Sequence, residues 1–446
     1  MEKMNQQSRD SLEKAPVPQA MMRMVVPMML SLIATLIYNI TDAFFIGKLN
    51  NTAMMAAVAL ALPFSALLMA LGHLLGVGAG TYVSRLLGED NAAAATRVCA
   101  VNFWSSLLTG VVLVAVCVPL LSPLLQLLGA KGATLPHTRD YILMFVIGAP
   151  FVIANFALEE TVRAEGAATA SMIGMVAGVV INIILNPIFI FTLHMNVMGS
   201  ALASVTGNAA SVAWFIFYLQ KKSAVQRVSL RDFQPSQAIY RNILKVGISA
   251  FLLDGFIVIT GLLFNHYAVL YGDGVMAGFG ISQRVVQITD FIGMSFSMGT
   301  VPLIAFAYAA KNRKRLMAII KTTAGAMAGI TLGLAAILFA LRARIIGAFS
   351  IDPAVIAVGQ TILAAQLCST IFAGLSGLFT GIFQAFGKAW PSTVMSVTRG
   401  IVFIPVLIFG NMLFAVNGVI WAMTVSEAFA CMVGLILWLG RVKDEA

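Results

Sequence analysis

Charged residues are scarce in this chain. Asp, Glu, Lys and Arg together make up only 10% of its 446 residues, whereas apolar residues make up 60%. The mean hydropathy of +0.93 lies far above the usual range of a water-soluble domain. The composition therefore excludes a soluble globular protein and indicates a chain that lies mostly within a lipid bilayer.

Cysteine and histidine are also few. The four cysteines each stand alone in an apolar segment, without a second cysteine at metal or disulfide spacing, and the four histidines lack the spacing of a metal site. The sequence contains no HExxH helix, no GxSxG turn and no nucleotide-binding P-loop. We therefore expect neither an enzyme nor an ATP-driven pump, and we expect no cofactor.

Long hydrophobic segments are what the chain does contain. Twelve stretches of about 20 apolar residues are each long enough to cross a bilayer as a helix, and the second six repeat the pattern of the first six at an offset of roughly 220 residues. This duplication is typical of a membrane transporter, which without an ATP site must use an ion gradient. The predicted fold is an all-α polytopic membrane protein with twelve transmembrane helices in two pseudo-symmetric six-helix bundles.

A polar interval divides the two halves. We predict a cytoplasmic N-terminal tail at 1–20, an N-lobe at 21–219, a cytoplasmic linker at 220–243, a C-lobe at 244–439 and a C-terminal tail at 440–446. Most of the 28 Lys and Arg residues fall on the side of both termini, which the positive-inside rule makes the cytoplasmic side. This bias explains the net charge of +10, so we predict contact with lipid and no nucleic-acid partner.

Several acids fall within predicted spans, where each costs about 2.5–3.5 kcal/mol on insertion scales and therefore marks a candidate site. They are Asp42, Glu159, Glu160, Asp254, Asp290 and Glu427. Glu159 and Glu160 lie within one turn of Arg163 near a span end, so we expect them to pair locally and to snorkel toward water.

Asp42 is the strongest of these candidates. Thr35, Tyr38, Asn39 and Asp42 recur at three- and four-residue spacing and predict one polar stripe on an otherwise apolar helix. Such a stripe is expected to face an aqueous cavity, where a carboxyl group can exchange a proton or release a cation. The alternative is an aspartate that anchors the outer end of the helix.

The second half carries a further group of charged and polar residues. Arg284, Gln287 and Asp290 follow one another along the eighth span, while Asp254, Arg399 and Glu427 lie in the seventh, eleventh and twelfth. These residues predict either a substrate or proton site or a static ion-pair network that holds the lobe together.

Three segments resemble one known family. They are Tyr38–Gly47 in the first span, the stretch from Val162–Gly166 through Ile181–Phe191 to Gly199–Ser204, and Pro302–Asn312 at the end of the eighth span, with Arg399 and Pro405 in the eleventh. The chain is similar to bacterial drug-efflux members of the multidrug and toxic compound extrusion (MATE) family. The resemblance implies an antiporter of the bacterial cytoplasmic (inner) membrane that exports small-molecule organic cations in exchange for H⁺ or Na⁺, and we expect a monomer.

The resemblance also implies a coupling site in the N-lobe, at Asp42, Tyr38, Asn182, Asn186 and Ser204. Many prokaryotic relatives have a second aspartate where this sequence has Asn186, so the site loses one charge and one titratable group. Asp42 would then hold a single proton or bind Na⁺ together with neutral oxygens. The acids of the second lobe, Asp254 and Asp290, are alternative coupling residues.

Two other classes of function compete with drug export. A flippase or exporter of lipid-linked or polysaccharide substrates would need a more cationic cavity to hold phosphates, whereas acids outnumber arginines in the predicted spans. A membrane-embedded enzyme would need a recognisable nucleophile and base, and a structural scaffold would have no reason to keep acids in its spans. The sequence therefore favours a cationic substrate.

Overall fold

The computed structural model describes residues 12–223, 225–350 and 352–442, and this part of the chain contains helices and no strand. Parts of the predicted N-terminal and C-terminal tails lie outside the described residues. Two compact units are present. Unit 1 contains Val26–Phe251, and unit 2 contains Ala15–Val25 and the chain from Leu252 onward. The units divide inside two helices, between Val25 and Val26 and between Phe251 and Leu252. The predicted linker at 220–243, which separates the sixth span from the seventh, stays a prediction.

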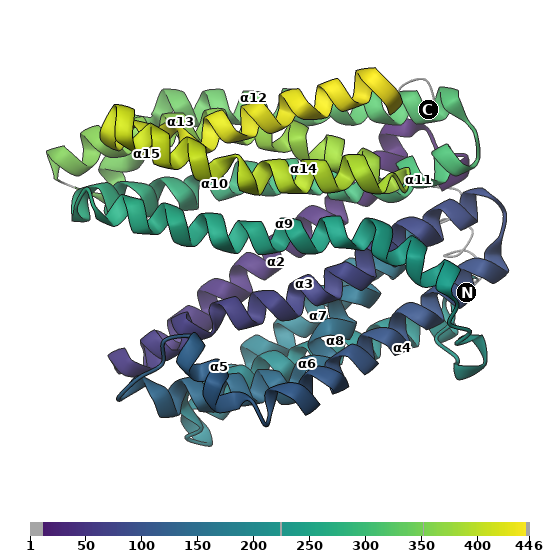
Figure 1. The fold of residues 1–446 in the computed structure, drawn as a ribbon, viewed down its shortest axis with the longest axis horizontal. Coiled ribbons are helices and arrows are strands. Elements are labelled where there is room, and N and C mark those ends of the chain that lie inside the picture. Colours follow the sequence, from purple (N-terminus) through teal and green to yellow (C-terminus); the bar gives the residue numbers. More distant parts are fainter. Residues whose placement is uncertain (1–11, 224, 351, 443–446) are drawn as a thin grey trace. The chain divides into compact units, whose positions relative to one another are not determined.

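Unit 1 is a bundle of long apolar helices (Figure 1). They are α2 (Val17–Gly47, from Val26 on), α3 (Thr52–Gly88), α4 (Ala92–Cys117), α6 (Thr134–Ala164), α7 (Ala168–Pro187) and α8 (Asn196–Lys221), with the short α5 (Leu121–Leu127) and a π-helical turn η1 (Ile188–Thr192). Each long helix is long enough to cross the hydrocarbon core, and α7 forms one such span together with η1. The predicted six spans of the first half are therefore present as helices.

Unit 2 repeats this architecture (Figure 1). Its helices are α9 (Gln237–Val269, from Leu252 on), α10 (Asp273–Gly299), α11 (Val301–Ala309), α12 (Arg313–Phe349), α13 (Pro353–Ala385), α14 (Ala389–Ile401) and α15 (Phe403–Leu437), followed by the turn η3 (Trp438–Val442). α10 and α11 together form one apolar run, Asp273–Ala309.

The final apolar run, Ala389–Gly440, is 52 residues long and contains two spans. A straight helix of that length would measure about 78 Å, far more than the hydrocarbon thickness of a bilayer. Ala415 has φ 49° and ψ −132°, and a Cβ built on Gly410 would lie 3.0 Å from the carbonyl oxygen of Gly418. In a helix without a break, Gly410 and Gly418 would lie about 12 Å apart along the axis, too far for this contact. The chain therefore turns back at Ala415, and the structure has the twelve transmembrane helices that the sequence predicts.

The linker begins in contact with the end of α6. The hydroxyl of Ser223 donates to Oε2 of Glu165 at 2.6 Å, and the side-chain amide of Gln226 donates to the carbonyl oxygen of Thr161 at 3.1 Å. Burial raises the pKa of the Glu165 carboxyl to about 7, although the hydrogen bond from Ser223 opposes this shift. The first residues of the linker are thus part of the packing of unit 1.

Close approach of α7 and α8 positions the polar residues that follow. A Cβ on Gly178 would lie 2.7 Å from the carbonyl oxygen of Gly207, and one on Gly207 would lie 2.6 Å from that of Gly178. Any larger side chain would push the two backbones apart, as is typical of helix contacts in membranes. Asn182 lies one turn after Gly178 and Ser204 about one turn before Gly207, so the two side chains are brought within reach of each other.

Candidate functional site

The carboxylate of Asp42 on α2 is the centre of a buried polar network in unit 1. Its Oδ1 accepts hydrogen bonds from Nδ2 of Asn186 on α7, at 2.9 Å, and from the hydroxyl of Ser200 on α8, at 2.5 Å. The residue is only 9% exposed, and no Lys, Arg or His of the described chain forms an ion pair with it. A buried carboxylate without a cationic partner is costly, so this site is suited to take up a proton or a monovalent cation.

The network continues from Asp42 to the other predicted coupling residues. Nδ2 of Asn182 donates to the hydroxyl oxygen of Ser204 at 3.2 Å, and the Tyr38 hydroxyl lies 2.9 Å from the same oxygen. Asn186 also contacts Oδ1 of Asn182 at 3.4 Å. The structure thus brings all five predicted residues together, and their role in ion coupling stays a prediction.

The site is assembled from three pairs of residues, each one helical turn apart: Tyr38 and Asp42 on α2, Asn182 and Asn186 on α7, and Ser200 and Ser204 on α8. Residues four apart lie on the same face of a helix. The spacing along each helix therefore places the two residues of a pair side by side, and the packing of the three helices brings the pairs together.

Two residues of the predicted stripe lie outside this network, and one residue of the network was not predicted. Thr35 bonds to the carbonyl oxygen of Ser31 in its own helix at 3.0 Å, and Asn39 is exposed, so neither takes part in the network. Ser200 was missed, although it makes the shorter of the two hydrogen bonds to Asp42. Its spacing of four residues from Ser204 could have predicted its place on the same face of α8.

Asn186 contributes an oxygen that has no partner. Its side chain is fully buried, its Nδ2 donates to Asp42, and its Oδ1 accepts no hydrogen bond from any described group. Buried acceptors are nearly always satisfied, so this oxygen is available to a bound proton donor, water or cation.

The second predicted group, in unit 2, centres on an ion pair. Nε and Nη2 of Arg399 on α14 donate to Oε1 of Glu427 on α15 at 3.1 and 2.9 Å. The hydroxyl of Ser376 on α13 donates to Oε2 of Glu427 at 2.7 Å. Both carboxylate oxygens of Glu427 are therefore engaged within the protein, which fits the predicted static network for this pair.

Asp290 on α10 lies within electrostatic range of Arg399 and Glu427, yet it forms no hydrogen bond or ion pair with any described group. Asp254 lies half-buried on α9. Arg284 is exposed and Gln287 is half-buried, and no hydrogen bond or ion pair joins either to Arg399 or Glu427 within the described chain. The structure thus brings together three of the six predicted residues of this group.

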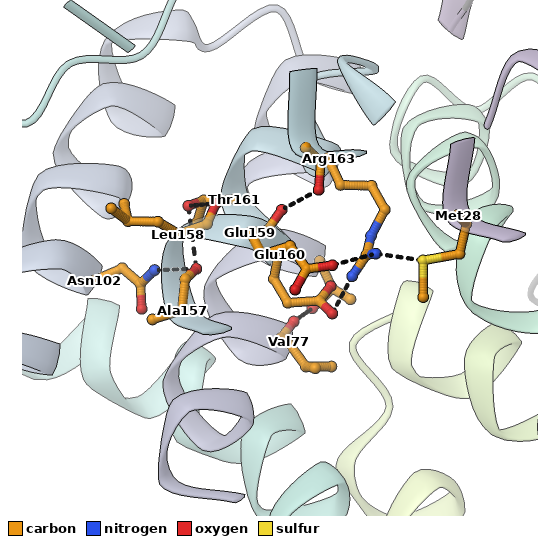
Figure 2. A network of polar contacts seen from close by, with 11 residues as sticks. Met28, Val77, Asn102, Ala157, Leu158, Glu159, Glu160, Thr161 and Arg163 are labelled. Atoms are coloured by element: carbon orange, nitrogen blue, oxygen red, sulfur yellow. Dashed lines mark hydrogen bonds and ion pairs between the residues drawn. The ribbon is translucent and has the colours of Figure 1, made fainter. Parts of the chain in front are cut away.

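A third cluster lies at the end of α6 (Figure 2). The guanidinium of Arg163 pairs with Glu159 at 3.3 Å and with Glu160, and its Nη1 also donates to the sulfur of Met28 on α2 at 2.7 Å. The predicted local pairing is confirmed. The predicted snorkelling is wrong, because Arg163 is only 2% exposed and packs against α2 instead of reaching water.

Comparisons with known proteins agree on one family. The family model described as MatE matches residues 27–188 and 250–409. The multidrug export protein MepA of Staphylococcus aureus (strain NCTC 8325 / PS 47) is 37% identical over 425 residues, covering 95% of this chain and 94% of that protein. MepA of Staphylococcus haemolyticus (strain JCSC1435) is also 37% identical with the same coverage.

Solved structures share the fold. A crystal structure of MATE in complex with MaL6 matches with a TM-score of 0.91 at 23% identity, covering 98% of this chain and 99% of that one. An outward-facing multidrug resistance MATE family transporter matches with a TM-score of 0.90 at 23% identity, covering 99% of this chain and 98% of that one. The predicted fold class and the family resemblance are confirmed.

Proposed function

This chain belongs to the MATE family of multidrug efflux transporters, and from this premise we propose that it is a secondary antiporter that exports organic cations in exchange for protons. Transport would proceed by alternating access, with the ion favouring one conformation and the substrate the other. The proposal includes the predicted cytoplasmic membrane location with both termini inside, a monomer as the working unit, and no cofactor besides the coupling ion.

The single observation that carries the proposal is the unbalanced charge of Asp42. Neutral groups surround this carboxylate, and the two hydrogen bonds that it accepts come from an amide and a hydroxyl. A mobile proton neutralises the site when it binds and leaves a buried negative charge when it departs. Because a buried charge is costly, the two states differ in energy, and that difference can be coupled to a conformational change.

Sodium is the second candidate for the coupling ion, because of the unpaired Oδ1 of Asn186. Carboxylate, amide and hydroxyl oxygens are the ligands that hard cations prefer. Asp42 supplies a carboxylate, and Asn186 and Ser200, whose side chains both hydrogen-bond to it, supply an amide and a hydroxyl oxygen. The proton is favoured because the site offers only one carboxylate.

Purified protein in liposomes tests the function directly. A fluorescent organic cation is loaded inside, and its efflux is followed under a pH gradient alone and then under a Na⁺ gradient alone, with protein-free liposomes as the control. We expect the pH gradient to drive efflux. Efflux driven by Na⁺ alone would identify the site as a sodium site, and no efflux under either gradient would favour export of lipid-linked or polysaccharide substrates.

In unit 2 we propose that Asp290 recognises the cationic substrate. Glu427 is neutralised by Arg399 and bonded by Ser376, so the acid of this group that has no cation of its own is Asp290. An organic cation at this position would balance its charge. Arg399 and Glu427 then keep their helices in place beside the substrate, and Asp254 on α9 would add to the negative potential of unit 2.

Asp290→Asn is expected to raise the KM for an organic cation by about tenfold, since a charge-assisted contact is worth about 1.5–3 kcal/mol. The KM of a neutral substrate is expected to stay within about twofold, because it gains nothing from the carboxylate. Transport kinetics in proteoliposomes measure both. Asp273→Asn, at the exposed start of the same helix, is the matched control, and an unchanged KM for the cation in Asp290→Asn would contradict the assignment.

A further inference from the structure

The face of α8 that bears the coupling site continues as a polar stripe beyond it. Ser200, Ser204 and Asn208 are four residues apart, and each later side chain donates to the carbonyl oxygen of the earlier residue. The hydroxyl of Ser204 bonds to Ser200 at 3.1 Å, and Nδ2 of Asn208 bonds to Ser204 at 2.8 Å. The stripe therefore leads away from Asp42 along the helix.

A second stripe on α6 joins the first. Asn155, Glu159 and Arg163 have the same spacing of four residues, and all three are buried. Nδ2 of Asn155 donates to Oδ1 of Asn208 at 2.9 Å and so connects the two helices. Polar groups thus follow one another from Asp42, along α8, across to α6, and on to the Arg163 end of that helix.

Two oxygens along this sequence of polar groups lack a partner. Oδ1 of Asn186, beside Asp42, and Oδ1 of Asn155, one turn before Glu159, are both buried and unbonded within the described chain. A buried acceptor without a protein partner normally binds an ordered water molecule. We therefore expect an ordered water molecule at each of these two oxygens.

We propose that a hydrated polar track inside unit 1 connects Asp42 with Glu159, and that the coupling proton leaves Asp42 along it. The inference rests on the proposed function, because it requires a proton on Asp42. The O–H bond of the Asp42 carboxyl breaks, water molecules pass the proton along the track, and a new O–H bond forms on the carboxylate of Glu159. No electron is transferred, and the proton then leaves Glu159 by way of the half-buried Glu160, which shares Arg163 with it, toward the end of α6 that the charge distribution predicts to be cytoplasmic.

The cluster at the end of α6 is suited to accept that proton. Two carboxylates, Glu159 and Glu160, share the single guanidinium of Arg163, so the three side chains carry an excess negative charge. The other groups that face them are His73 of α3, which acts on Glu159 electrostatically, and the uncharged Met28 of α2. A proton on one carboxylate leaves a neutral pair and removes the excess charge.

Replacing Asn155 by leucine tests the track, because the apolar side chain is of similar size and displaces both the amide and its water. We expect the turnover of pH-driven efflux to fall by about tenfold or more, with a larger solvent deuterium isotope effect, while equilibrium binding of the organic cation stays within about twofold. Asn155→Ser, which leaves room for water, is expected to restore the turnover. A merely structural role would change binding and stability together.

Asn102 provides a matched control in the same unit. It is also fully buried, it donates to the carbonyl oxygen of Ala157 on α6 at 3.0 Å, and its Oδ1 is also unpaired, yet it lies outside the track. Wild-type turnover in Asn155→Leu, or equal slowing in Asn102→Leu, would overturn the inference. If Asn155→Leu does not fold, Glu159→Gln takes its place, since it removes the acceptor but keeps the shape, and wild-type turnover in that variant overturns the inference equally.

The same assay separates this inference from the proposed function. Efflux driven by the pH gradient in Asp42→Asn would overturn the proton-coupling function itself. An inactive Asp42→Asn together with fully active Asn155→Leu and Glu159→Gln would overturn only the track. That result would indicate that the proton leaves Asp42 through the substrate pathway.

Discussion

Asp42→Asn is expected to lower ion-driven efflux by about 100-fold or more while the protein still inserts into the membrane. The amide has the shape of the carboxylic acid but binds no proton and carries no charge. The donors from Asn186 and Ser200 would then face a neutral group in every state of the cycle. The energy difference between loaded and empty sites would vanish, and with it the coupling to the gradient.

Efflux from proteoliposomes under an imposed pH gradient measures this effect, and equilibrium binding of the organic cation shows whether the variant is folded. Thr35→Ala is the matched control on the same helix, because the Thr35 hydroxyl bonds only within its own helix, to Ser31. Its efflux is expected to stay within about twofold of wild type. A fully active Asp42→Asn would remove Asp42 from the mechanism.

Arg163→Ala is expected to lower the free energy of unfolding by about 3–5 kcal/mol. The substitution leaves Glu159 and Glu160 without the guanidinium that pairs with both, in surroundings where Glu159 is only 5% exposed. It also removes the contact with the sulfur of Met28, which ties α2 to α6. Unfolding of the detergent-solubilised protein by SDS or heat would measure the loss.

Neutralising the two acids should recover most of that loss. Arg163→Met combined with Glu159→Gln and Glu160→Gln replaces a buried charged cluster by neutral groups of similar size, a change that is often tolerated. Arg284→Ala, at an exposed position without an ion pair in the described chain, is expected to change stability by no more than about 0.5 kcal/mol. A loss below about 1 kcal/mol in Arg163→Ala would show that the cluster is not a stabilising element.

The fold could be predicted because a bilayer leaves few choices. A backbone in hydrocarbon must satisfy its hydrogen bonds within the helix, so the length of each apolar stretch is enough to place a span. The turn at Ala415 divides the long final run into two spans, which agrees with the predicted number of twelve. The helix-spaced pairs of the coupling site follow from the same regular geometry.

Other features could not be predicted, because they depend on how helices pack against one another. The spacing on α6 gives no sign that Met28 of α2 covers Arg163. Snorkelling toward water was therefore predicted for a cluster that the structure buries. In the second half, only the packing of α10, α13, α14 and α15 separates the paired Glu427 from the unpaired Asp290. Sequence distance gives no information about which opposite charges meet.

Composition and helical periodicity are enough to predict the membrane location, the twelve spans, their duplication and the polar residues on each helix, because both are local properties of a chain in lipid. The tertiary structure alone decided which of these polar residues meet. Ser200 joins Asp42 because of how α8 packs against α2, and Asn155 joins Asn208 because of how α8 packs against α6, where Gly148 faces Val205. That choice depends on contacts between residues far apart in the chain, which no local pattern records.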